Sequence, residues 1–158
     1  MSDDDAPEAR LEAWIARYSP EVAGVARAVL AKMRERLPGA VQMVYDNYNA
    51  LAITFGPGER ASEAVFSVAL YPRRVSLFFL HGAGLPDPQQ RLQGSGNQVR
   101  SVVLRGADDL DDPALRALMD AALRRAPRPI DPAHPGRIVI KSVSARQRPR
   151  RPDGDPGG

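Results

Sequence analysis

The 158-residue sequence contains no cysteine and only two histidines. Disulfide bonds, thiolate metal sites and cysteine nucleophiles are therefore excluded. His81 and His134 show neither the His-x-x-x-His nor the Glu-x-x-His spacing, so the motifs of zinc hydrolases and di-iron helical sites are also missing. No apolar run approaches the roughly 20 residues that cross a membrane. No nucleophile–base pair can be assembled from the sequence, so an enzyme is the least favoured functional class.

The composition is that of one globular domain with irregular ends. Hydrophobic residues make up 43% of the chain and charged residues 26%, and 15 prolines point to long loops. The start, Met-Ser-Asp-Asp-Asp, is acidic where a signal peptide would be basic, which predicts a cytoplasmic protein with no membrane partner. We expect a disordered acidic leader at 1–6, a folded domain at 7–143 and a disordered Arg/Pro/Gly-rich tail at 144–158.

The most informative stretch lies between residues 66 and 80. Two runs rich in β-branched and aromatic residues are separated by a turn at Pro72 and Arg73. If Tyr71 faces Arg74 across this turn, the large apolar side chains of both runs fall on one face of an antiparallel pair. The predicted core-side pairs are Leu70–Val75, Val68–Leu77 and Phe66–Phe79. The opposite face is mixed, and it is either solvated or lines a shallow groove.

The remaining patterns predict helices around this sheet. Residues 6–18 and 19–37 have apolar side chains at helical spacing, and Ser19-Pro20-Glu21 is typical of a helix start. Further strands are expected near 41–46, 51–55 and 99–104, with an edge strand or extended arm at 137–141. A last helix begins after Asp108–Pro113. The predicted class is α+β, a single two-layer domain with a mostly antiparallel five-strand sheet and helices packed chiefly on one face.

Polar residues suited to ligand binding concentrate in the predicted loops. The densest cluster is Tyr45-Asp46-Asn47-Tyr48-Asn49, which is either a turn or a recognition patch beside the sheet. The Gly94-Ser95-Gly96 loop can present backbone amides to an anion or can simply be flexible. Arg100 can clamp a carboxylate or phosphate, or project outward from its strand. His81, at a strand end, is a ligand contact or a hydrogen-bonded structural residue.

Two charged clusters have competing interpretations. Asp108, Asp109, Asp111 and Asp112 can ligate a hard cation, but their placement at a helix start already explains them as caps and helix-dipole partners. The arginines that follow residue 145 can neutralise nucleic-acid phosphates. No aromatic residue interleaves them, so the alternative is a solvated tail with weak nucleic-acid contact at most.

The two helices, the Tyr45 turn cluster and the run Val75-Ser76-Leu77-Phe78-Phe79 resemble the YdhG-like bacterial domains of unknown function. The resemblance covers roughly residues 11–126. It implies a small α+β protein, and it implies iron handling or small-ligand binding because some members are described as frataxin-like iron chaperones. The Tyr45 region and the Gly-Ser-Gly loop both depart from the family pattern. Beyond iron, no cofactor is expected.

The first functional expectation is a non-enzymatic protein that binds a small ligand or a metal. Its ligand-binding residues would be Tyr45, Asp46, Asn47, Tyr48, Asn49, His81, Gly94, Ser95, Gly96 and Arg100. The alternative is an interaction module that engages protein or nucleic acid through the Arg-rich tail. The identity of a metal ligand set and the oligomeric state are left open by the sequence.

Overall fold

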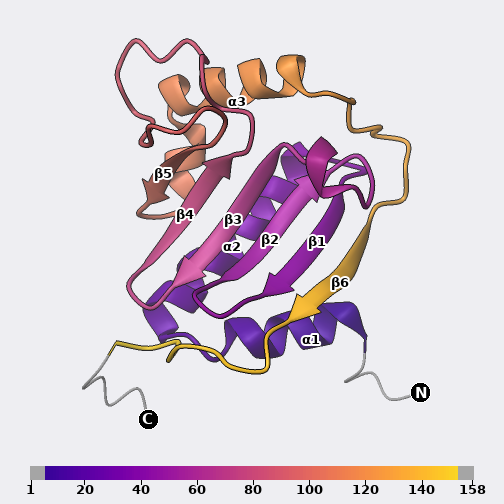
Figure 1. Cartoon of the computed structure of the whole chain (residues 1–158), viewed down its shortest axis with the longest axis vertical. Coiled ribbons are helices and arrows are strands. Elements are labelled where there is room, and N and C mark those ends of the chain that lie inside the picture. The colour runs from indigo at the N-terminus through magenta and orange to yellow at the C-terminus, as the bar shows by residue number, and fades with distance from the viewer. Residues whose placement is uncertain (1–5, 153–158) are drawn as a thin grey trace.

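The computed structural model describes residues 6–152 and confirms the α+β class. One six-stranded sheet has the order β5-β4-β3-β2-β1-β6 (Figure 1). Its strands are β1 (Val41–Asp46), β2 (Leu51–Gly56), β3 (Phe66–Tyr71), β4 (Arg74–Phe79), β5 (Arg100–Leu104) and β6 (Arg137–Val143). The helices are α1 (Pro7–Ile15), α2 (Pro20–Arg36) and α3 (Pro113–Arg125), with short 3-10 turns η2 (Ala61–Glu63) and η3 (Ala107–Asp111). Within 6–152, no helix is long and apolar enough to span a membrane.

The sheet has six strands rather than the predicted five, and it is mixed because one pairing is parallel, although antiparallel pairings predominate as predicted. β1 to β5 form antiparallel neighbours, but β6 adds a sixth strand parallel to β1. The connector from α3 to β6 passes close to Gly39, where an added Cβ would lie 1.9 Å from the carbonyl oxygen of Asp131. Gly39 also has a φ of +85°, a conformation that glycine adopts without strain. Glycine at this position therefore leaves room for the returning chain, which then pairs with the free edge of β1.

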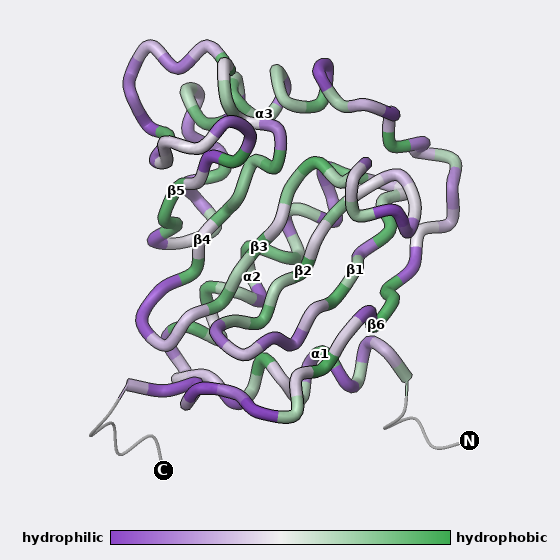
Figure 2. The backbone as a smooth tube through the Cα atoms, viewed as in Figure 1, coloured by the Kyte–Doolittle hydropathy of each residue, from purple (hydrophilic) through white to green (hydrophobic). Residues whose placement is uncertain are grey.

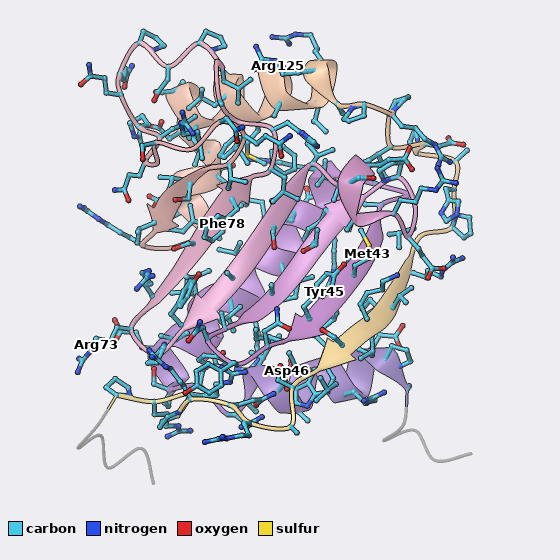
Figure 3. All side chains as sticks on the ribbon, viewed as in Figure 1. Met43, Tyr45, Asp46, Arg73, Phe78 and Arg125 are labelled. Atoms are coloured by element: carbon cyan, nitrogen blue, oxygen red, sulfur yellow. The ribbon has the colours of Figure 1, made fainter. Side chains whose placement is uncertain are left out.

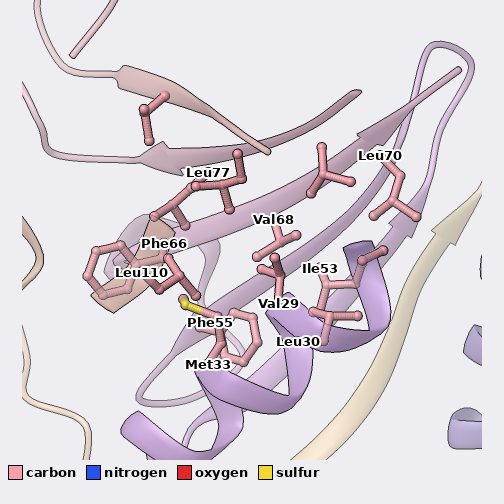
Figure 4. Close-up of a cluster of buried hydrophobic side chains, with 14 of the residues drawn as sticks. Val29, Leu30, Met33, Ile53, Phe55, Phe66, Val68, Leu70, Leu77 and Leu110 are labelled. Atoms are coloured by element: carbon pink, nitrogen blue, oxygen red, sulfur yellow. The ribbon is translucent and has the colours of Figure 1, made fainter. Parts of the chain in front are cut away.

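The predicted hairpin register is confirmed in full. Tyr71 pairs with Arg74, and the three core-side pairs form as expected. Figure 4 shows how Val29, Leu30 and Met33 of α2 pack against this face of the sheet. The other core residues labelled in that view are Ile53, Phe55, Phe66, Val68, Leu70, Leu77 and Leu110. All three α-helices bury side chains in this one cluster, so the second layer lies on one face of the sheet.

Two helix starts are confirmed by their caps. The Ser19 side chain accepts a hydrogen bond from the backbone N–H of Val22 at 3.2 Å, and Pro20 is the first residue of α2. Asp112 caps α3 by accepting from the backbone N–H of Leu115 at 3.1 Å. Each cap satisfies an N–H group that the helix leaves without an internal partner.

The two ends of the sheet carry different connections. The β1–β2 and β3–β4 turns lie together at one end, here called the turn end. The end of β4, the long segment 80–99 and the start of β5 lie at the other end, here called the loop end. Figure 3 shows Met43, Tyr45 and Phe78 on the face away from α2. Arg73 extends from the turn end and Arg125 lies near the loop end.

Candidate functional site

The predicted ligand-binding residues are divided between the two ends of the sheet. Asn47, Tyr48 and Asn49 belong to the β1–β2 turn, which closes the pair Asp46–Leu51 at the turn end. His81 follows β4 at the loop end, where Phe79 pairs with Arg100. The strands therefore separate the Tyr45–Asn49 cluster from His81 and from residues 94–100. These residues do not meet in one site.

At the loop end, Arg100 is engaged by its own loop. Its Nη1 donates to the carbonyl oxygens of Gly96 and Val99 at 2.7 and 2.8 Å. Gly94 has a φ of +125°, and Ser95 and Gly96 are exposed. The side chain of His81 is half-buried, and its Nε2 has no hydrogen-bond partner in the described part of the chain. Nη1 of Arg100 therefore ties the 94–100 loop together.

At the turn end, the structure buries a carboxylate. Asp46 is 1% exposed, and its Oδ1 accepts a hydrogen bond from Nη2 of Arg150 at 2.9 Å. Arg150 is itself 5% exposed, and its guanidinium lies over the ring of Tyr18, 5.7 Å from the centroid. A second cation, Nη1 of Arg17, lies 3.7 Å from Oδ2 of Asp46. The buried negative charge is therefore compensated, as burial of a charge requires.

Residues 144–152 form a segment that we call the C-terminal arm. The arm runs along the turn end, where the backbone N–H groups of Ser144 and Arg148 donate to the carbonyls of Asp46 and Tyr48 at 2.8 and 2.9 Å. Gln147 Nε2 also donates to the Asp46 carbonyl, at 3.0 Å. The sequence predicted disorder from residue 144 onward, because the arm has little to bury. Polar contacts hold it instead, and the predicted disorder at 1–5 and 153–158 lies outside the described residues.

The arm and the β3–β4 turn enclose a cleft of about 670 Å³, which we call the arginine cleft. None of the described residues that line it is acidic. Figure 2 shows that both of these segments are strongly hydrophilic. The lining residues are Asn49, Tyr71, Pro72, Arg73, Arg74, Arg148, Pro149, Arg151 and Pro152. Four arginines from two distant parts of the chain therefore share one concave surface.

Two of these arginines are paired with tyrosine rings. The guanidinium carbon of Arg74 lies 4.0 Å from the centroid of the Tyr71 ring. Arg148 lies over Tyr48 at 5.5 Å, and Tyr48 is 46% exposed. The tail contains no aromatic residue of its own, but the fold places Tyr48 beside Arg148 of the tail. Each pair is a cation–π contact that orients a planar cation at the surface.

Three of the cleft arginines, Arg73, Arg74 and Arg148, form no ion pair with an acidic residue in the described part of the chain. A second hollow of about 250 Å³ lies beside the same turn, with Arg73, Arg74 and Arg105 in its lining and Glu21 as its one acidic member. The turn end therefore carries a row of arginines with few acids to balance them, which attracts anions.

The acidic cluster at η3 is engaged in structural contacts. Asp111 bonds to Lys32 and to Arg36, and the bond from Lys32 lowers the pKa of Asp111 below its usual value. The bond from the Leu115 amide lowers the pKa of Asp112, as does its pairing with Arg91. In residues 6–152, no group of three His, Asp or Glu side chains is placed to hold a metal ion. The described residues thus explain this cluster through caps and ion pairs.

Sequence reasoning missed most of the cleft. Asn49 belongs to the predicted set. Tyr71 and Arg74 were placed on the mixed face that is either solvated or lines a shallow groove, and Arg73 was assigned only to a turn. The Pro-Arg-Arg turn and the arginine tail are both visible in the sequence. What was not visible is that they meet, because 74 residues separate Arg74 from Arg148 (148 − 74).

No family model matches this chain, and searches of the curated proteins and of the solved structures find no match either. The resemblance to YdhG-like domains and the iron handling that it implies therefore stay predictions.

Proposed function

We propose that the protein is a non-enzymatic binding protein whose arginine cleft holds a ligand carrying several phosphate groups. The observation that carries this proposal is the convergence of Arg73, Arg74, Arg148 and Arg151 on one cleft, where none of the described lining residues is acidic. Guanidinium groups bind phosphate oxygens through paired, charge-assisted hydrogen bonds. Asn49 adds an amide at the same cleft. This replaces the divided set of residues predicted from the sequence with one contiguous site.

The proposal joins the two functional expectations drawn from the sequence. Of the predicted ligand-binding residues, Asn49 lines the cleft and Tyr48 contacts Arg148, and the arginines of the tail supply part of the charge. His81 and residues 94–100 are not part of this site because they lie at the opposite end of the sheet. A location in the cytoplasm, where phosphate-bearing ligands are abundant, stays a prediction.

Calorimetric titration with inorganic tripolyphosphate at low ionic strength tests this function. The double variant Arg73→Ala/Arg148→Ala should weaken binding by at least about tenfold, since a hydrogen bond to a charged group contributes about 1.5–3 kcal/mol. The matched control is Arg116→Ala/Arg124→Ala, which removes the same charge from exposed positions on α3. Its affinity should stay within about twofold of the unchanged protein. Equal losses of affinity in the two double variants would show that only net charge matters and would contradict binding at the arginine cleft.

A further inference from the structure

The two arginine–tyrosine pairs indicate a chemical feature of the ligand in addition to its negative charge. Arg74 on Tyr71 and Arg148 on Tyr48 each present a flat guanidinium backed by an aromatic ring at the cleft. A phosphate needs the hydrogen-bond donors of an arginine, but it gains nothing from a planar stack. Nucleobases do gain from it, because unpaired bases stack on guanidinium planes and on aromatic side chains.

The arginines also continue beyond the cleft. Arg73 and Arg74 line both the arginine cleft and the second hollow, and Arg105 lies in that hollow. The cationic surface therefore extends across the β3–β4 turn in two hollows that share these two arginines. A compact anion would occupy one of them, whereas a chain with phosphates at regular intervals can follow both. Proteins generally bind single-stranded nucleic acids in a basic groove that follows the sugar-phosphate backbone, with aromatic rings placed along it.

We infer that the ligand of the arginine cleft is single-stranded nucleic acid, which rests on the proposed function and specifies its substrate class. The phosphates contact the arginines of the two hollows, and a base stacks at Tyr48 and Arg148. Tyr48 is the aromatic residue to test because it is 46% exposed and lies at the surface of the β1–β2 turn. A duplex keeps its bases stacked internally, so it cannot use this pair. An acidic peptide offers charge but lacks a run of flat rings.

Fluorescence anisotropy with an end-labelled oligothymidylate of about 12 nucleotides, a length on the scale that small single-strand-binding domains cover, tests the inference. Unlabelled inorganic polyphosphate of equal phosphate content, a duplex of the same length and poly-glutamate serve as competitors. The oligothymidylate should bind at least about tenfold more tightly than each of them. With one phosphate contact from each of the five arginines of the two hollows, the logarithm of its binding constant should fall against the logarithm of salt concentration with a slope of about −3.5.

Substitutions at Tyr48 separate the contribution of base stacking from the contribution of charge. Tyr48→Ala should weaken oligothymidylate binding by about fivefold or more, as expected for loss of one stacked base, and leave polyphosphate binding unchanged. Tyr48→Phe, which keeps the ring, should restore the affinity. Both variants change an exposed turn residue, and circular dichroism with thermal unfolding checks that they fold. If Tyr48→Ala unfolds the protein, Arg105→Ala gives the second readout, because it should weaken oligothymidylate more than tripolyphosphate.

The outcomes distinguish the nucleic-acid inference from the proposed phosphate-binding function. If polyphosphate binds as tightly as oligothymidylate and Tyr48→Ala changes neither, the nucleic-acid inference is wrong and the phosphate-binding function stands. Equal binding of the duplex overturns single-strand selectivity, and equal competition by poly-glutamate overturns the nucleic-acid class. If neither oligothymidylate nor tripolyphosphate binds, both the inference and the proposed function are wrong.

Discussion

Asp46 and Arg150 form a buried ion pair across 104 residues of sequence, with 2.9 Å between Oδ1 and Nη2. Arg150 also donates to the carbonyl oxygens of Asn47 and Tyr48. One guanidinium thus binds the end of β1 and the turn that follows it. The consequence for function is direct, since Arg148 and Arg151 stand beside Arg150 and supply two of the cleft's arginines. The ion pair therefore positions half of the cationic groups of the candidate site.

Replacing Asp46 by Asn should release the C-terminal arm. Leaving Arg150 buried without its carboxylate would cost about 3 kcal/mol or more, so detachment of the arm is the cheaper response. Trypsin should then cleave faster after Arg146 and Arg150, because the bonds after Arg148 and Arg151 precede proline. Mass spectrometry of the timed digest gives the cleavage sites. Asp120→Asn, an exposed residue on α3, is the control of equal charge. Equal digestion rates in the two variants would contradict the role of the ion pair.

Deleting residues 144–158 should leave the domain folded and impair binding. The two hydrophobic clusters contain no residue of the arm, so the truncated chain keeps its core. It loses Arg148 and Arg151 from the cleft, and tripolyphosphate affinity should fall by at least about tenfold. Thermal unfolding and calorimetry measure the two properties on one sample. A truncated protein that binds tripolyphosphate as well as the full chain would show that the arm takes no part.

Tyr18 should make stability fall at alkaline pH. Its hydroxyl donates to the Leu70 carbonyl at 3.1 Å and accepts from the Leu51 amide at 3.2 Å, and burial raises its pKa to about 12. The unfolded chain loses this proton near pH 10, so the folded state binds it more tightly between about pH 10 and 12. Stability attributable to Tyr18 is present below about pH 10 and declines above it, by up to about 3 kcal/mol for a shift of two pH units.

Urea unfolding of Tyr18→Phe beside the unchanged protein measures this effect. At neutral pH the variant should be less stable by about 1–3 kcal/mol, because the buried Leu51 amide loses its acceptor. The difference should shrink as the pH rises past about 10. Tyr48→Phe, at an exposed position, should show no such change. A difference between Tyr18→Phe and the unchanged protein that stays constant with pH would contradict the assignment.

Asp111 should contribute to stability at neutral pH and lose that contribution in acid. The hydrogen bond from Lys32 and the charge of Arg36 lower its pKa in the folded state. The contribution is therefore fully present above the unfolded pKa of about 3.9, and it is lost as the pH falls through the lower folded pKa. Asp111→Asn should unfold at lower urea than the unchanged protein at pH 7, and the gap should close below about pH 4. Asp108→Asn, a neighbour in η3, is the control.

The parts of the fold that were predictable depend on local chemistry. The β3–β4 register could be predicted from the alternation of large apolar residues around Pro72. The helix starts at Ser19 and Asp112 could be predicted from residues only a few positions away in the sequence. β6 was recognised as extended chain, but its parallel pairing with β1 depends on the path of the connector beside Gly39. A sequence pattern records which face a strand buries, and it does not record which edge the strand joins.

The candidate site was less predictable because tertiary contacts assemble it. Asp46 was expected to face a ligand, but it is buried and bonded to Arg150. The absence of aromatic residues in the tail favoured a solvated tail, whereas Tyr48 is supplied by a turn about 100 residues earlier (148 − 48). Low apolar content predicts disorder on average. It does not anticipate an arm that is held by carbonyl acceptors and one buried carboxylate.

The most direct test of the arginine cleft is a ¹⁵N–¹H correlation spectrum titrated with tripolyphosphate. If tripolyphosphate binds in the arginine cleft, the amide signals of Tyr71, Arg73 and Arg74 should shift together with those of Arg148 and Arg151. All of these shifts should follow one saturation curve. Amides at 81 and 94–100 should stay in place, because they lie at the opposite end of the sheet. Shifts confined to His81 and the 94–100 loop, or the absence of any saturable shift at the turn end, would contradict the account.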